Sequence, residues 1–209
     1  MNNEKRTPVI KKRKNRIAKE NKAELAIGEI MQTEGPAGLK MSNISKYSGV
    51  DKKMLYRDYG TVENLVEAFW ESEDIRFQEL PVDVATLTKD KLVDLVMAAV
   101  QKHYLFFTQN KAARSFMIWE ITERNKFLSK MNKKSEAVHQ VFLDQIKPFL
   151  KEKEAKFITV YATIYSSVNS FVLRTKNIPG SHYGFNAGNE ERRKQLFLTF
   201  REMLEFSLR

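Results

Sequence analysis

The sequence predicts an all-α protein, and three observations support this class. Apolar residues recur at intervals of three and four over most of the chain, and no stretch alternates as a strand does. Glycine and proline are sparse, with 8 and 5 residues among 209. There are no cysteines, so the fold cannot depend on disulfides or thiolate metal sites. We expect about nine helices, divided between an N-terminal three-helix unit and a larger C-terminal helical domain.

The first helix is indicated by five apolar residues at helical spacing, before Gly35-Pro36 ends it. These residues are Ala23, Ala26, Ile27, Ile30 and Met31. Two short helices are expected next, at Met41–Tyr47 and Lys52–Tyr59, separated by Ser48-Gly49. Because helices this short are unstable alone in water, they must pack together with the first. Residues 22–60 therefore form the predicted N-terminal domain.

Residues 61–209 form the predicted C-terminal domain. Its first helix begins at Thr61, a good N-cap, and runs to Pro81, so that residues 61–80 connect the two domains. We expect the helix that begins near Asn125 to be interrupted around Lys130–Lys134. Residues 177–189, rich in glycine, should form a loop. The remaining helices are expected at Lys89–Thr108, Lys111–Thr122, Asn125–Leu150, Glu154–Asn177 and Glu190–Ser207.

The net charge of +10 is concentrated at the start of the chain. Through Lys22, nine basic residues face two acidic ones, whereas from Ala23 to Gly60 five of each cancel. We therefore expect residues 1–21 to be a basic, flexible arm, which suits either phosphate binding or a solvated end. The arm has no apolar core of a signal peptide, and no later run could span a membrane. We expect a cytoplasmic protein with no membrane partner.

Residues 39–65 carry the most informative motif. A helix-turn-helix needs an apolar residue on its first helix, a small residue where the helices approach, a glycine in the turn, and apolar residues that seat the second helix. Ile44, Ser45, Gly49, Val50 and Leu55 fill these places in order. An ordinary corner between two helices can show the same pattern.

The wider arrangement resembles the tetracycline-repressor (TetR) family. An amphipathic helix ends in Glu-Gly, the segment G-V-x-K-x-x-L-Y-x-x-Y follows at 49–59, and a capped helix with E-x-L comes next. The match covers Ala23–Phe69, while the remaining chain is similar only in being helical. The resemblance implies a homodimeric, ligand-responsive transcription regulator, most simply a repressor, that binds a roughly palindromic site on double-stranded DNA.

The resemblance also assigns roles to residues. Lys52 and Lys53 begin the recognition helix, where lysine suits guanine O6 and N7 in the major groove. Tyr56 matches a phosphate-binding tyrosine of the family, and the alternative is an aromatic residue of the core. For Lys52 and Lys53 the alternative is a solvated face. The candidate DNA-binding residues are Lys40, Ser42, Tyr47, Lys52, Lys53, Tyr56 and Arg57, with Lys11, Lys12, Arg13, Lys14 and Arg16 in the arm.

Three residues depart from the family pattern. Lys40 stands where a capping Ser or Thr is usual, Asp58 stands near the expected phosphates and should repel them, and Val62 replaces a lysine at the start of the next helix. Each change weakens anchoring to the DNA backbone, and the basic arm can compensate. The competing interpretation is a ligand-binding or protein-interaction module on the same fold whose DNA binding has degenerated.

The helix at Glu154–Asn177 is apolar nearly all round, which indicates burial on two sides. The resemblance implies that it pairs with the last helix and their copies in a homodimer; a monomeric core is the alternative. The candidate dimerisation residues are Phe157, Ile164, Val168, Phe171, Phe197, Phe200 and Leu204.

An effector pocket is expected among the central helices, although core packing explains each of its candidates too. They are His103, Phe106, Phe107, Phe116, Trp119, Tyr161, Tyr165 and Asn169. The three histidines, His103, His139 and His182, have no metal-ligand spacing, and no catalytic motif is present. We therefore expect no metal, no cofactor and no enzymatic activity, with a small molecule of unidentified chemistry as the effector.

Overall fold

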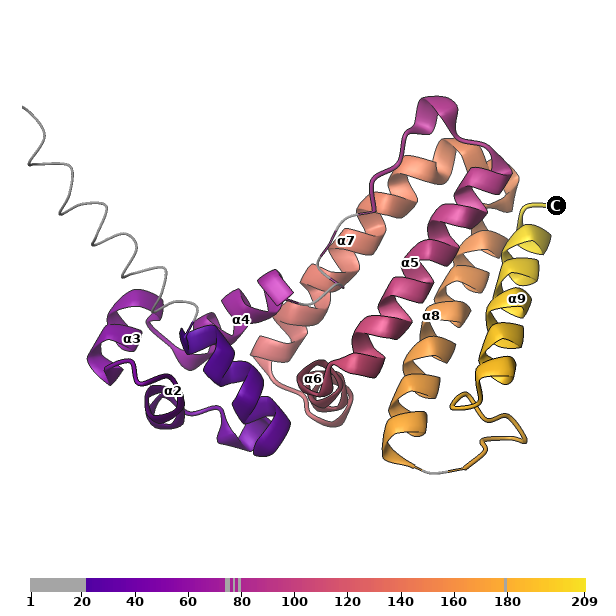
Figure 1. The fold of residues 1–209 in the computed structure, drawn as a ribbon. Helices are drawn as coiled ribbons and strands as arrows, with labels where there is room; N and C mark the ends of the chain where they lie inside the picture. Colours follow the sequence, from indigo (N-terminus) through magenta and orange to yellow (C-terminus); the bar gives the residue numbers. More distant parts are fainter. Residues whose placement is uncertain (1–21, 74–75, 77, 79, 179) are drawn as a thin grey trace, which may run out of the picture. The chain divides into compact units, whose positions relative to one another are not determined.

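The computed structural model describes residues 22–73, 76, 78, 80–178 and 180–209. In this part of the chain the fold is all-α, and its only β feature is an isolated bridge between His182 and Phe185. A first helix covers residues 22–33. The helices that follow are α2 (Met41–Ser48), α3 (Lys52–Tyr59), α4 (Val62–Glu73), α5 (Lys89–Gln109), α6 (Lys111–Thr122), α7 (Lys126–Leu150), α8 (Glu154–Asn177) and α9 (Glu190–Ser207) (Figure 1).

The chain divides into two compact units. Unit 1 comprises residues 1–74 and 111–131, and unit 2 comprises residues 75–110 and 132–209. The sequence places a domain boundary after residue 60, whereas here α4 and α6 belong to unit 1. Burial explains this difference, because Trp70 of α4 is fully buried and stacks on Phe116 of α6, with ring centroids 4.7 Å apart.

Unit 1 is organised around the apolar stripe of its first helix. The five residues predicted for this stripe are all buried. Met41 and Ile44 of α2, Leu55 of α3, and Leu65 and Val66 of α4 are also buried. The short helices α2 and α3 are therefore held by packing, as their length requires.

The predicted extent of α4 is partly wrong. Its start agrees, because the hydroxyl of Thr61 accepts a hydrogen bond from the backbone N–H of Asn64 at 3.1 Å. The helix ends at Glu73 rather than near Pro81, and the described residues 76, 78 and 80 are not α-helical. Periodic apolar residues alone could not locate this end.

The interruption predicted in α7 is absent, since the helix is continuous from Lys126 to Leu150. The polar run at 130–134 is compatible with a helix because one buried face continues through it. Leu128, Met131 and Ser135 are buried, and the Nζ of Lys130 lies 2.6 Å from a carboxylate oxygen of Glu67, which is itself only 8% exposed.

In unit 2, α5, α8 and α9 lie side by side and pack against one another (Figure 1). The description of α8 as apolar nearly all round is wrong. One face is buried, with Phe157, Tyr161, Ile164, Val168 and Val172 at helical spacing. The opposite face is exposed and carries small residues, namely Thr159, Ala162, Thr163, Ser166 and Ser170. No helix within the described residues is long and apolar enough to cross a membrane.

Candidate functional site

The junction between α2 and α3 is a tight turn with a specific hydrogen-bond pattern. Gly49 caps α2 with φ 65°, a left-handed conformation that glycine adopts without strain. The hydroxyl of Ser45 donates to the carbonyl of Val50 at 2.7 Å, and the N–H of Val50 donates to the hydroxyl of Ser48 at 3.1 Å. Ser45, the small residue predicted at this position, therefore links α2 by a hydrogen bond to Val50 in the turn before α3.

Helix α3 has one buried and one exposed face. Leu55 is 2% exposed and seats the helix in unit 1. The side chains of Lys52, Lys53, Tyr56 and Arg57 are exposed to solvent. Tyr56 is 48% exposed, so the alternative of a core aromatic does not describe it. The four side chains form what we call the α3 basic face.

The start of α3 is fixed by a residue that the sequence analysis did not single out. The carboxylate of Asp51 accepts hydrogen bonds from the N–H groups of Lys53 at 2.8 Å and Met54 at 3.4 Å. The Nζ of Lys52 lies 5.8 Å from the centroid of the Tyr56 ring, within the range of a cation–π contact. The cap and this contact orient the first turn of the α3 basic face.

Arg57 is already engaged by its neighbour. Its Nε and Nη2 donate to the two carboxylate oxygens of Asp58 at 2.8 and 3.1 Å. The hydrogen bonds and charge of Asp58 raise the pKa of the Arg57 guanidinium. The sequence suggests that Asp58 repels phosphates by itself, whereas the structure shows that it also neutralises the adjacent cation.

The hydroxyl of Tyr47 is likewise already hydrogen-bonded within the chain. Its hydroxyl donates to Glu34 Oε1 at 2.7 Å, and Asn43 Nδ2 donates to Glu34 Oε2 at 3.0 Å. The hydrogen bond to Glu34 raises the pKa of the Tyr47 hydroxyl. Glu34 and Asn43 were not predicted, and the Glu-Gly that ends the first helix was the only signal for them.

The other predicted DNA-binding residues lie at the start of α2 or in the arm. Lys40 and Ser42 are exposed, and Lys40 occupies the N-cap position of α2 without a side-chain hydrogen bond to the helix. Val62 is the first residue of α4. The arm residues Lys11, Lys12, Arg13, Lys14 and Arg16 lie outside the described residues.

In unit 2 the structure brings several predicted effector-site residues together. His103 Nε2 lies 2.7 Å from Asn169 Oδ1, and the His103 ring packs against Phe107 and Tyr165. Phe106 meets Phe107 edge to face. Phe116 and Trp119 are not part of this group, because they belong to unit 1, where they pack against each other.

A second histidine, not predicted for this site, completes the group. His139 Nδ1 lies 2.8 Å from the hydroxyl of Tyr161. Burial lowers the pKa of His139, and it raises the pKa of Tyr161 and also that of Tyr165, the latter to about 12. Near pH 7 the imidazole of His139 is therefore neutral and both phenols keep their protons.

Three members of this group, His103, His139 and Tyr165, border a cavity of about 50 Å³. It is lined also by Arg76, Gln78 and Lys102, none of which was predicted. Among the described residues, no three His, Asp or Glu side chains are grouped as metal ligands.

The predicted dimerisation residues lie mainly inside unit 2. Phe157, Ile164, Val168, Phe200 and Leu204 are buried. The two others also pack internally, Phe171 against Phe185 and Phe197 against Tyr104. None of the seven is among the exposed residues, and Phe171 and Phe197 are half-buried.

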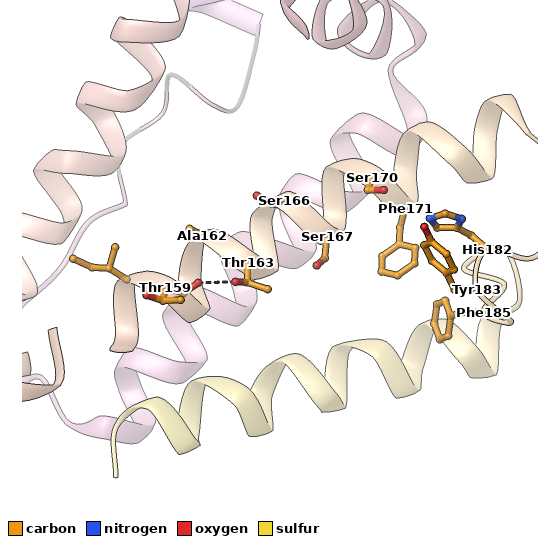
Figure 2. Close-up of a pocket in the computed structure, with 11 residues that line it drawn as sticks. Thr159, Ala162, Thr163, Ser166, Ser167, Ser170, Phe171, His182, Tyr183 and Phe185 are labelled. Carbon is orange, nitrogen blue, oxygen red and sulfur yellow. Dashed lines mark hydrogen bonds between the residues drawn. The ribbon is translucent and has the colours of Figure 1, made fainter. Parts of the chain in front are cut away.

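The outward side of α8 borders a groove of about 850 Å³. Its small side chains form one wall, and Phe171, His182, Tyr183 and Phe185 gather at one end (Figure 2). This groove was not predicted, because hydroxyl-bearing residues within an apolar helix gave no indication that they share an exposed face.

No protein-family model matches the chain, and no curated protein matches it.

Proposed function

We propose that residues 22–60 are a helix-turn-helix DNA-binding domain and that α3 is its recognition helix. The observation that carries the proposal is the α3 basic face, presented to solvent by a helix whose other face is anchored through Leu55. Lysine donors at the start of such a helix suit the acceptors of guanine in the major groove. Tyr56 and Arg57, one turn later, are placed for the phosphate backbone.

We further propose that the whole chain is a homodimeric, ligand-responsive regulator of the TetR type, most simply a repressor. A two-fold axis would set two recognition helices about one turn of DNA, roughly 34 Å, apart on a palindromic site. A ligand bound in unit 2 would change DNA affinity only by favouring one of two conformations.

For the dimer, the outward side of α8 and α9 is the supporting feature. The small side chains on α8 allow close approach of another helix, while Leu198 and Phe206 of α9 are 55% and 58% exposed. Thr163→Arg should separate the dimer into monomers, measured by light scattering on the eluting peak. Ala137→Arg, on the exposed face of α7, is the matched control. Equal dimer content in both variants would count against this surface.

The DNA-binding proposal is tested by selecting sequences from a pool of random duplexes with the full-length protein. A roughly palindromic consensus is expected. Lys52→Ala and Lys53→Ala should each relax the preference at particular base pairs, at a cost of about 1–3 kcal/mol per lost base contact. Lys89→Ala and Lys126→Ala, at exposed lysines of α5 and α7, each remove one positive charge, as the changes in α3 do, and should each keep the consensus.

The second candidate is a ligand-binding or interaction module with degenerate DNA binding. The pairing of Arg57 with Asp58 and of Tyr47 with Glu34 favours it, because both engage groups that could otherwise contact phosphates. If the selection yields no consensus, and binding to duplex DNA depends on salt but not on sequence, this second function replaces the first.

A further inference from the structure

The outward face of α8 carries a row of small side chains with a symmetric spacing. The row is centred between Ala162 and Thr163, and the intervals on the two sides of this point are the same. If a second α8 crossed the first antiparallel at this point, each small side chain would meet another small one, and the two backbones could approach closely. The exposed members of the row are Ala155, Thr159, Ala162, Thr163, Ser166 and Ser170.

The groove along this row offers little to a charged or strongly hydrogen-bonding ligand. The hydroxyls of Thr159 and Thr163 donate to carbonyls of the preceding turn of α8, at 2.8 and 2.7 Å. Among the described residues that line the groove, none is a lysine, arginine, aspartate or glutamate. Two copies of a chain with a net charge of +10 can therefore meet here without burying like charges. A second copy of the chain fits this face better than a charged ligand does.

An exposed tyrosine lies at one end of the row (Figure 2). His182 and Phe185 exchange two backbone hydrogen bonds, of 2.7 and 3.0 Å, and Tyr183 and Gly184 form the turn between them. Tyr183 is 96% exposed, and its φ of 51° is in the left-handed region, where asparagine and glycine are favoured. A large aromatic side chain that stays in solvent at such a position indicates a contact outside this chain.

The opposite end of the row carries a group that suits a tyrosine ring. Lys156 Nζ lies 3.5 Å from the centroid of the Phe206 ring and donates to the Phe206 carbonyl at 2.7 Å. Phe206 is itself 58% exposed. A second aromatic ring can pack against Phe206 and face the ammonium group at the same time.

Symmetry brings these two ends together. A two-fold axis through the centre of the row exchanges its ends, so Tyr183 of one copy arrives beside Lys156 and Phe206 of the other. In the parallel alternative, Lys156 would meet its own counterpart, and like ends of the two α8 dipoles would lie side by side. The antiparallel arrangement avoids both repulsions.

We propose that Tyr183 anchors a symmetric interface in which α8 packs antiparallel against α8 of a second copy, with the two helices crossing between Ala162 and Thr163. Each Tyr183 side chain contacts Lys156 and Phe206 of the opposite copy. The inference rests on the proposed homodimer, and it adds the orientation of the two copies and the side chain that fixes this orientation.

Disulfide cross-linking tests the orientation, because the chain has no cysteine of its own. Thr159 and Ser166 lie symmetrically about the proposed crossing, and within one helix they are about 10 Å apart, too far for a disulfide. The variant with both Thr159→Cys and Ser166→Cys should therefore form a cross-linked dimer under mild oxidation, whereas Thr159→Cys alone should not. Ala137→Cys, on the exposed face of α7, gives the level of random collision. Cross-linking of Thr159→Cys above that level would show the parallel arrangement and overturn the proposal.

Tyr183→Asn separates the anchoring role from a role in the fold. Asparagine suits the left-handed backbone, so in the monomeric Thr163→Arg background this change should not lower the midpoint of thermal unfolding. In the wild-type background it should weaken the dimer about tenfold or more, measured by sedimentation over a series of concentrations. Val141→Asn, at a residue of α7 that is 44% exposed, is the control and should leave the dimer unchanged. An unchanged dissociation constant for Tyr183→Asn overturns the anchoring role.

Failure of this inference can be told apart from failure of the proposed function. A wild-type chain that stays monomeric in light scattering overturns the homodimer and this inference together, and it leaves the face to a ligand or a different protein. A dimer that neither cross-links through positions 159 and 166 nor weakens in Tyr183→Asn overturns this inference alone. The expected cross-linking, without a consensus from the duplex selection, supports this inference and overturns specific DNA recognition.

Discussion

Replacing Asp58 by Asn should strengthen binding to DNA through Arg57. The carboxylate of Asp58 holds Arg57 by two hydrogen bonds at 2.8 and 3.1 Å, and the Arg57 side chain is 67% exposed. An asparagine removes the charge that competes with a phosphate for the guanidinium. Because the Arg57 side chain is exposed, loss of this pair should change the free energy of unfolding little.

The magnitude follows from counterion release. One extra phosphate contact steepens the slope of log affinity against log salt by about 0.9, so a dimer gains about 1.8. Between 50 and 200 mM salt, a fourfold change, the advantage of Asp58→Asn over the wild type should therefore shrink about twelvefold. Fluorescence anisotropy with a labelled duplex, measured at four or more salt concentrations, gives both slopes.

A double-mutant cycle decides between two accounts of Asp58. If the carboxylate acts by occupying Arg57, Asp58→Asn should have little effect on the salt slope in an Arg57→Ala background. If it acts by repelling phosphates directly, as the sequence suggests, the change should strengthen binding equally in both backgrounds. An equal gain would refute the reasoning from the ion pair, and no gain in either background would remove Asp58 from the interface.

Three further predictions concern stability, measured by urea or thermal unfolding. Gly38→Ala should destabilise the protein by about 1–3 kcal/mol, because a Cβ there would lie 2.6 Å from the Cβ of Glu34. Gly49→Ala should destabilise it by about 1–2 kcal/mol through the φ of +65° alone. Asparagine in place of alanine should recover most of the lost stability at position 49 but not at position 38. Asp51→Ala should lower the free energy of unfolding by about 1 kcal/mol, because it removes the N-cap of α3. Asp51→Ser should retain most of the stability that the cap provides. Equal losses of stability in the two variants would contradict the capping role. The lowered pKa of His139 means that the unfolded state binds more protons below about pH 6.5, so the free energy of unfolding should fall as the pH drops below that value. His139→Gln should reduce this dependence, and an unchanged pH profile would show that other groups cause it.

The bounds of several helices were predictable from the sequence. The predicted bounds of α6, α8 and α9 agree with the structure. For α9 the reason is visible, since Asn189 accepts a hydrogen bond from the N–H of Arg192 at 3.0 Å and a glycine-rich loop precedes it. The break predicted in α7 is absent because Met131, which is fully buried, keeps that turn packed against a core.

The candidate sites were predictable only in part, because their partners are distant in sequence. Glu34 reaches Tyr47 across 13 positions, and His139 reaches Tyr161 across 22. No periodicity within one helix contains that information. The α3 basic face, by contrast, lies within about a turn and a half of one helix, so the family resemblance that singled out Lys52, Lys53 and Tyr56 needed only a local segment of sequence.

The dimerisation residues illustrate a more general ambiguity. A stripe of large apolar residues has the same spacing whether its partner is another helix of the same chain or a helix of a second copy. Ile164 and Val168 are fully buried within their own unit, so packing inside this chain is enough to explain their part of the stripe. The exposed face of α8 bears Thr163 and Ser166 instead, and side chains that small permit close helix contact without an apolar signal in the sequence. An interface between copies, if α8 forms one, would therefore depend on close packing of backbones more than on buried apolar area.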